Sequence, residues 1–320
     1  MRKVLYALAL LVLSGGSVLA QQLPQFSHYG FNGMYISPGY AGITNKTEFT
    51  AIYRYQWAGY ETSFDGNSGQ PQTGLFSASI PISALKGGIG VHFATDELGA
   101  TDMLNGGLSY AYHLNVGQGK LGIGVQGNFT NISKGEYRAI DPSDPRIPFN
   151  SSDSKFDVGA GLWYQSDKFY AGLGTSNLLQ AKYEFETADE NSNQKASVTG
   201  ERHAYFTAGY NIPVSYTVTV TPTAIVKTDL NETNFEVGAR ALFNDKFWGG
   251  LGYRHQDAVT ALAGIGFLKD NNMRLGYAFD LVTFDSDAKA RTSHEIMLSY
   301  RLPKTGLPVK PAIKTPRYSF

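Results

Sequence analysis

The feature that most limits how this chain can fold is a repeated alternation of apolar and polar residues over segments of about ten residues. Apolar residues alternate with polar ones from Leu104 to Leu114, and again from Leu121 to Thr130. Such a pattern places one face of a strand in an apolar medium and the other face in a polar one. Fourteen segments show it, at residues 47–57, 73–82, 87–95, 103–115, 119–133, 156–166, 168–176, 201–211, 215–228, 233–244, 247–256, 258–268, 272–284 and 292–302.

Every long connection between these segments follows an odd-numbered segment. Connections after odd-numbered segments include residues 134–155 and 177–200, whereas those after even-numbered segments are as short as 83–86 or the single residue Asp167. An outer-membrane barrel with both chain ends in the periplasm needs this sorting, because its outer loops are long and its inner turns are short. A soluble sandwich has no such need. We therefore predict an all-β fold, a transmembrane antiparallel β-barrel of fourteen strands over residues 47–302.

The first twenty residues have the pattern of a secretory signal peptide. Arg2 and Lys3 precede an apolar core from Val4 to Leu13, and a small-residue cleavage site ends at Ala20. This core is too short to cross about 30 Å of hydrocarbon as a helix. We therefore expect residues 1–20 to direct export, and the protein to reside in the outer membrane in contact with its lipid.

An aromatic segment follows the leader, within residues 21–46. The stretch from Gln25 to Gly42 holds five Tyr and Phe residues, which is more apolar surface than a solvated linker carries. Glycine and proline residues interrupt both the helical and the strand period. The sequence therefore predicts an irregular segment, ordered by packing inside the barrel lumen or at its periplasmic mouth, with Phe31 and Tyr40 against barrel residues.

Charged residues in the predicted strands lie on the face opposite the large apolar residues. Because arginine facing lipid near the midplane costs about 2–4 kcal/mol, we expect them to point into the lumen. Their mixed signs favour a self-neutralising network over an ion-selective ring, with a conduction or docking site as the alternative. The candidate members are Asp157, Glu236, Arg240, Arg274, Asp280 and Glu295, with Arg54 and Arg254 on the same face.

The longest predicted outer loops, residues 134–155 and 177–200, are polar and rich in turn residues. They are either solvated or a contact surface for a secreted partner, since binding residues collect on loops of rigid scaffolds. From Pro303 the alternation ends. We expect residues 303–320 to form a periplasmic tail, either disordered or docked on a periplasmic partner through its basic and aromatic residues.

The sequence carries no motif of a catalytic or cofactor site. It has no cysteine, and its six histidines lie singly, without the spacing of a metal site or of a catalytic triad. Its 27 basic and 27 acidic residues balance, so nothing attracts nucleic acid to the chain as a whole. We therefore expect no enzymatic activity, no cofactor, no metal and no nucleic-acid partner.

Several motifs around the aromatic segment are shared with a known family. They are Pro24-Gln25-Phe26-Ser27, Tyr29, Phe31-Asn32, Tyr35, Pro38-Gly39-Tyr40-Ala41-Gly42, Arg54-Tyr55-Gln56-Trp57 and the aromatic ending Pro316-Arg317-Tyr318-Ser319-Phe320. Together they resemble the PorP/SprF family of outer-membrane proteins, associated with type IX secretion and gliding motility. Ser37 and Ser319 depart from the family pattern.

This resemblance implies a non-enzymatic accessory of type IX secretion. Similar proteins help to bring large secreted adhesins to the surface or hold them there through the adhesin's C-terminal domain, and connect to periplasmic peptidoglycan-binding lipoproteins with an OmpA-like domain. The candidate plug or partner contacts that it implies are Gln25, Phe26, Tyr29, Phe31, Asn32, Tyr35, Pro38, Tyr40, Arg54 and Trp57.

Two other functions stay open at this point. A hydrophobic-solute transporter like FadL also pairs fourteen strands with an N-terminal plug, but it needs an apolar lumen pocket and a lateral opening. A diffusion porin needs an open bore with a one-sided cluster of charge, which an aromatic segment in the lumen would obstruct.

Overall fold

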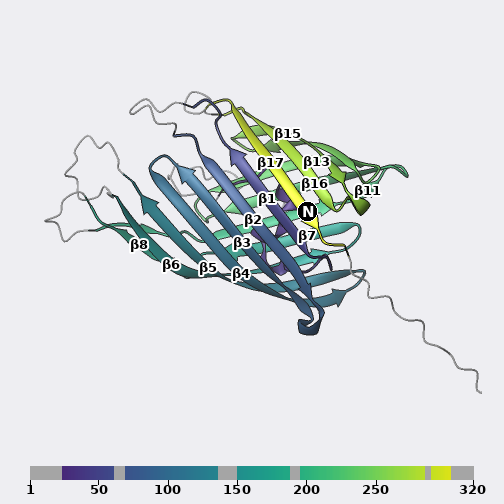
Figure 1. The fold of residues 1–320 in the computed structure, drawn as a ribbon, viewed down its shortest axis with the longest axis horizontal. Helices are drawn as coiled ribbons and strands as arrows, with labels where there is room; N and C mark the ends of the chain where they lie inside the picture. The colour runs from purple at the N-terminus through teal and green to yellow at the C-terminus, as the bar shows by residue number, and fades with distance from the viewer. Residues whose placement is uncertain (1–23, 61–68, 136–149, 188–194, 285–289, 304–320) are drawn as a thin grey trace, which may run out of the picture.

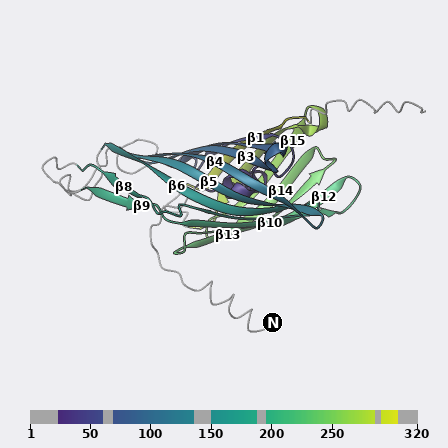
Figure 2. The same ribbon diagram turned by 90° about the horizontal axis from the view of Figure 1, so that it is seen from below.

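The computed structural model describes residues 24–60, 69–135, 150–187, 195–284 and 290–303, and forms a closed antiparallel barrel around one internal segment (Figure 1, turned by 90° in Figure 2). The predicted fold class is confirmed. The fourteen barrel strands are β1 (Glu48–Tyr55), β2 (Gln72–Ile82), β3 (Gly87–Leu98), β4 (Thr101–Val116), β5 (Gly119–Lys134), β6 (Ser151–Gln165), β7 (Phe169–Ser176), β10 (His203–Tyr210), β12 (Val218–Thr228), β13 (Thr233–Phe243), β14 (Phe247–Arg254), β15 (Ala258–Phe267), β16 (Met273–Val282) and β17 (Thr292–Arg301).

Each barrel strand pairs with the next one along the chain, and β1 pairs with β17 to close the ring. A two-residue strand, β11 (Ile212–Pro213), continues the line of β10, and both pair with β12. The largest boundary difference is in β6, which begins at Ser151, whereas the sequence pattern predicts residue 156. Residues 151–155 are all polar, so apolar alternation does not detect them.

The two ends of the barrel differ. The strand ends that lead into the longest connections, after β1, β5, β7 and β16, lie at one end, which we call the loop end. At the opposite end, which we call the turn end, every connection is short (Figure 1). Two of these turns contain short 3-10 helices, η3 (Ser83–Leu85) and η4 (Lys269–Asn271). The predicted leader, residues 1–20, and tail residues 304–320 lie outside the described part of the chain.

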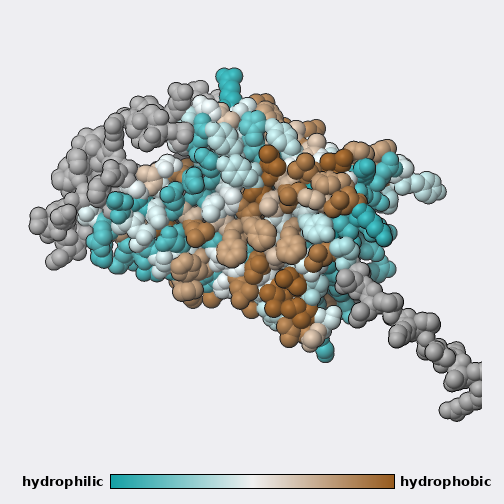
Figure 3. Space-filling model, viewed as in Figure 1, coloured by the Kyte–Doolittle hydropathy of each residue, from teal (hydrophilic) through white to brown (hydrophobic). Residues whose placement is uncertain are grey.

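The outer surface of the wall carries an apolar band between these ends (Figure 3). Large side chains on alternate strand positions face outward, such as Leu108 at 62% exposed, Val125 at 61% and Leu251 at 68%. In water such a continuous surface would be unfavourable, whereas lipid is its natural solvent. The wall is therefore built to sit in a bilayer.

Residues 24–46, which we call the plug, lie inside the barrel. Lys227 Nζ donates to the Pro24 carbonyl at the loop end (3.2 Å), and His113 Nε2 donates to the Ala41 carbonyl at the turn end (2.8 Å). The plug therefore crosses the lumen from loop end to turn end before β1 begins. It contains three short helical turns, η1 (Tyr29–Phe31), α2 (Gly33–Ile36) and η2 (Pro38–Tyr40). Within the described residues, no helix is long and apolar enough to cross a membrane.

Glycines form the inner face of the wall where the plug comes closest. A Cβ atom added at Gly122, Gly124 or Gly174 would overlap backbone atoms of the plug residues Ile36 to Gly39. Gly88 in β3 similarly faces the backbone of Ala41 and Gly42. Since only glycine permits such an approach of two backbones, this half of the wall, from β3 to β7, is shaped to accept the plug.

The loop after β7 contains a hairpin that the sequence analysis did not predict. Strands β8 (Lys182–Phe185) and β9 (Ala196–Thr199) pair with each other, and Tyr183 and Phe185 pack against Ile132 of β5. Each strand has four residues, which is too short for a periodicity search. In hindsight, Tyr183 and Phe185 alternating with charged neighbours were its sequence signal.

The glycine wall gives a direct test on one strand. Replacing Gly124 with Ala puts a Cβ into the Pro38 and Gly39 backbone, whereas a Cβ at Gly127, also in β5, meets no atom within 4 Å. We expect Gly124→Ala to displace the plug and destabilise the barrel by about 1–3 kcal/mol, the usual cost of overpacking. Urea unfolding of the folded barrel in lipid vesicles measures this effect. Equal unfolding midpoints for Gly124→Ala and Gly127→Ala would contradict a tightly seated plug.

Candidate functional site at the plug and barrel interface

Buried charged residues surround Ser27 in the loop-end half of the lumen. The Ser27 hydroxyl donates to Asp280 of β16 (2.8 Å) and accepts from Arg54 Nη1 (3.0 Å) and Arg254 Nη2 (3.2 Å). The Ser27 backbone N–H donates to Glu295 Oε2 (2.7 Å). A single plug residue thus contacts charges from four strands. We call these residues, with Glu236, the charged cluster.

The cluster is built from residues that face each other across neighbouring strands. Arg54 of β1 is opposite Glu295 of β17, and their side chains pair at 3.2 Å. Glu236 of β13 is opposite Arg254 of β14, with an ion pair of 2.9 Å. Asp280 joins the two pairs by bonding to Arg54 (2.7 Å) and Arg254 (3.1 Å). The network therefore ties together the strands from β13 round to β1, across the seam where the barrel closes.

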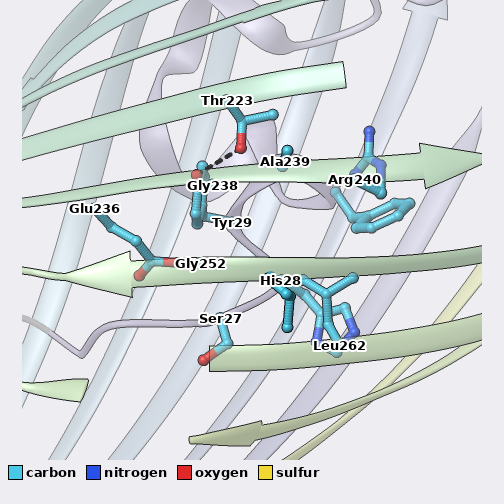
Figure 4. Close-up of a pocket in the computed structure, with 13 residues that line it drawn as sticks. Ser27, His28, Tyr29, Thr223, Glu236, Gly238, Ala239, Arg240, Gly252 and Leu262 are labelled. Carbon is cyan, nitrogen blue, oxygen red and sulfur yellow. Dashed lines mark hydrogen bonds between the residues drawn. The ribbon is translucent and has the colours of Figure 1, made fainter. Parts of the chain in front are cut away.

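The plug supplies further donors to the carboxylates. The His28 N–H and Nδ1 both lie 2.8 Å from Glu295 Oε1, and Gln25 Nε2 donates to Glu236 (3.3 Å). Three carboxylates face two guanidinium groups in this buried site, so the additional hydrogen bonds compensate the charge excess. Figure 4 shows Ser27 and His28 on the plug and Glu236 on the neighbouring wall.

A small cavity of about 20 Å³ lies between the plug and β13 to β15 (Figure 4). The Tyr29 hydroxyl lies on its edge and bonds to Thr223 Oγ1 at 2.7 Å. This volume suits one water molecule. Among the residues that the structure describes, no group of three or more His, Cys, Asp or Glu residues is arranged to hold a metal ion.

Aromatic contacts hold the rest of the plug. Phe26 packs edge-on against Tyr35 with ring centroids 5.4 Å apart, and Tyr40 packs edge-on against Trp163 of β6 at 4.9 Å. Phe31 lies 5.3 Å from Trp248 of β14. Edge-to-face ring pairs at such distances stabilise the fold by more than the apolar area that they bury. The aromatic residues of the segment therefore face one another or the wall.

At the turn end, Tyr40 also joins the plug to the barrel seam. Its hydroxyl donates to Glu48 Oε2 (2.8 Å), and Glu48 pairs with Arg301, directly opposite it on β17 (2.6 Å). Burial, and then the charge of Glu48, hold the pKa of Tyr40 well above its usual value. The hydroxyl therefore keeps its proton and stays a hydrogen-bond donor at neutral pH.

The remaining predicted site residues lie apart from the charged cluster. Asp157 accepts the N–H groups of Leu179 (2.9 Å) and Ala181 (3.3 Å), so it anchors the loop that leads to β8. Arg240 and Arg274 lie nearer the turn end and line a second cavity.

Among the plug candidates, Asn32 and Pro38 are buried. Trp57 follows β1 rather than joining the plug, and its N–H donates to Ser293.

The sequence analysis does not name some residues of this interface as candidate site residues. Ser27 belongs to the motif Pro24-Gln25-Phe26-Ser27 and His28 directly follows it, which was the available signal, but neither is among the candidate contacts. Glu48 and Arg301 lie at strand ends, where charge gives no sign of a role. The contact of the wall glycines with the plug depends on a segment distant in sequence, so the strand pattern gives no signal of it.

A closed barrel with an apolar outer band and a polar, internally plugged lumen defines an outer-membrane β-barrel protein. Its sequence identifies it more closely. The profile of type IX secretion system membrane proteins PorP/SprF matches residues 18–300, so the chain belongs to the PorP/SprF family, and the resemblance of its motifs is confirmed.

Other comparisons are more distant. A search of curated proteins found no match. Among solved structures, the CymD monoaromatic hydrocarbon channel is similar with 13% identity and a TM-score of 0.49, covering 84% of this chain and 92% of that one. The toluene transporter TbuX of Ralstonia pickettii is similar with 12% identity and a TM-score of 0.49, and the match covers 84% of this chain and 92% of that one. A FadL homologue of Pseudomonas aeruginosa is similar with 13% identity and a TM-score of 0.41, and the match covers 80% of this chain and 89% of that one.

The charged cluster predicts a large effect for one substitution. Arg254→Gln leaves Glu236 without a buried cationic partner and leaves Asp280 with Arg54 alone, and losing one member of a buried pair costs about 3–5 kcal/mol. The matched control is Lys182→Gln, whose partner Glu184 is 48% exposed, so the expected cost is at most about 1 kcal/mol. Urea unfolding in lipid vesicles compares the two. Similar shifts would show that the cluster does not stabilise the barrel.

Two substitutions of Tyr40 separate its ring from its hydroxyl. Tyr40→Phe removes the hydrogen bond to Glu48, at a cost of about 1.5–3 kcal/mol for a bond to a charged group. Tyr40→Ala also removes the contact with Trp163, at about 3–5 kcal/mol. Heat-modifiable migration and limited proteolysis of the plug report both effects. If Tyr40→Ala behaves like the unaltered protein, the plug does not depend on this anchor.

Proposed function

We propose that this chain is a non-enzymatic outer-membrane accessory of type IX secretion and gliding, which assists the secretion or surface attachment of large adhesins. Family membership supports the secretion system. The observation that supports the mode of action is the plug, which Ser27 fastens at the loop end and Tyr40 at the turn end. A barrel whose lumen holds its own packed segment is suited to presenting surfaces to partners.

The two ends of the barrel would then serve two partners. With the turn end in the periplasm, the loop end faces the cell surface, where the β8–β9 hairpin offers an ordered platform for an adhesin's C-terminal domain. The turn end, with the tail from residue 303, would contact a peptidoglycan-binding lipoprotein with an OmpA-like domain. The barrel would thereby connect a surface protein with the cell wall.

Copurification from the native host tests this proposal. The tagged protein is extracted gently from outer membranes, crosslinked and examined by mass spectrometry. Recovery of a large surface adhesin or a peptidoglycan-binding lipoprotein, with crosslinks at opposite ends of the barrel, supports it. Recovery of the barrel alone with bound fatty acid or another apolar solute would overturn it in favour of a transporter.

The hairpin gives a more specific prediction. Glu184 and Glu186 in and after β8 are exposed and pair with Lys182 and Lys195, so their side chains are accessible to a partner. Reversing both charges, Glu184→Arg with Glu186→Arg, is expected to lower the recovered adhesin several-fold without changing barrel stability, because rim charges set association more than folding. The control is Asp270→Arg in η4 at the turn end. Unchanged adhesin recovery in the double variant would exclude this face as the contact.

A further inference from the structure

A second cavity, of about 390 Å³, lies at the turn end between the plug and the short connections. Lys168 from the β6–β7 turn and Asn211 from the β10–β12 connection line one part of it. Arg240 of β13 and Arg274 of β16 line it as well. We call it the vestibule. Its volume lies in the range of small-molecule sites, about 300–1,000 Å³.

The two arginines of the vestibule differ from three others that face the lumen. Arg54, Arg254 and Arg301 each pair with a carboxylate. Within the described residues, Arg240 and Arg274 make no ion pair and no side-chain hydrogen bond, although the guanidinium of Arg240 stacks 4.1 Å from the Phe31 ring centroid. Arginine has five N–H donors, and leaving them unused beside a partly enclosed cavity is costly. These donors are therefore available to a ligand.

The vestibule is lined by both cationic and apolar side chains. Its titratable side chains are Arg240, Arg274 and Lys168 against Asp167 and Asp245, an excess of one positive charge. The apolar part of the wall is formed by Phe31, Pro213, Leu242 and Trp248. This combination suits an anionic group next to an apolar side chain.

We propose that the vestibule binds a carboxylate-bearing peptide segment of a periplasmic protein. The guanidinium groups of Arg240 and Arg274 receive the carboxylate, in the planar geometry that suits arginine, and Leu242 and Trp248 contact the neighbouring apolar side chain. The location of the partner rests on the orientation in the proposed function, with the turn end in the periplasm. The binding of the peptide by the vestibule does not depend on that orientation.

Its position favours a peptide over a lipid headgroup. The lining residues Thr219, Thr221 and Arg240 lie on the inner side of the wall, and Phe31 belongs to the plug. The apolar band that meets lipid lies on the opposite side of the same strands. A headgroup would have to leave the bilayer to reach the arginines, whereas a peptide enters from the aqueous side.

Calorimetric titration of the purified full-length barrel in detergent tests the proposal. The probe is the peptide N-acetyl-Glu-Leu-Glu, and its neutral counterpart is N-acetyl-Gln-Leu-Gln amide. We expect the acidic probe to bind and the neutral one not to bind. Arg274→Gln is expected to weaken binding about tenfold or more, the loss of one hydrogen bond to a charged group, whereas Lys182→Gln at the loop end leaves it unchanged. Heat-modifiable migration verifies that each variant is folded.

Three results would overturn the proposal. The first is no binding of the acidic probe to the unaltered barrel at about 1 mM. The second is equal binding by Arg274→Gln and the unaltered protein. The third is inorganic phosphate displacing the probe at equal concentration, which would make the vestibule a site for free anions. Because the probe is used with purified protein, its failure is distinct from a failure to copurify an adhesin or a lipoprotein.

Discussion

The burial of five charged side chains around Ser27 is the interaction on which the arrangement of plug and wall depends. Buried ion pairs seldom stabilise a protein more than apolar pairs would, because the charges lose their hydration. Their greater effect here is on the strand pairing. Arg54 faces Glu295 and Glu236 faces Arg254 in register, so a one-residue slip of a strand would turn a charge towards lipid. The cluster therefore selects one register for this part of the barrel.

The two halves of the wall hold the plug by different means. The strands from β13 round to β1 bind it through charges and hydrogen bonds to Ser27 and His28. On the strands from β3 to β7, glycines let the plug backbone lie directly against the strand backbone. The first half determines where the plug lies along the barrel axis, and the second determines how closely it fits. Neither half alone encloses the segment.

Much of the barrel could be predicted from sequence because strand alternation and loop length are local properties. The predicted members of the lumen network could not be sorted, because their depth along the barrel is not local. Arg54 and Arg240 both face inward, yet Arg54 lies at the level of Glu295 while Arg240 lies towards the turn end over Phe31. Asp157 lies on the other side of the barrel, with the loop amides of Leu179 and Ala181. Pairing of this kind depends on contacts more than 200 residues apart, such as Ser27 with Glu295.

The plug is continuous with the wall that encloses it, because five residues after Gly42 lead into β1 at Glu48. If the charged cluster opens, the segment stays attached at the turn end and meets its site again at a high effective concentration, of the order of millimolar for a short connection. Release is therefore an intramolecular equilibrium that does not change when the protein is diluted. A competing partner has to overcome this local concentration before it can occupy the lumen.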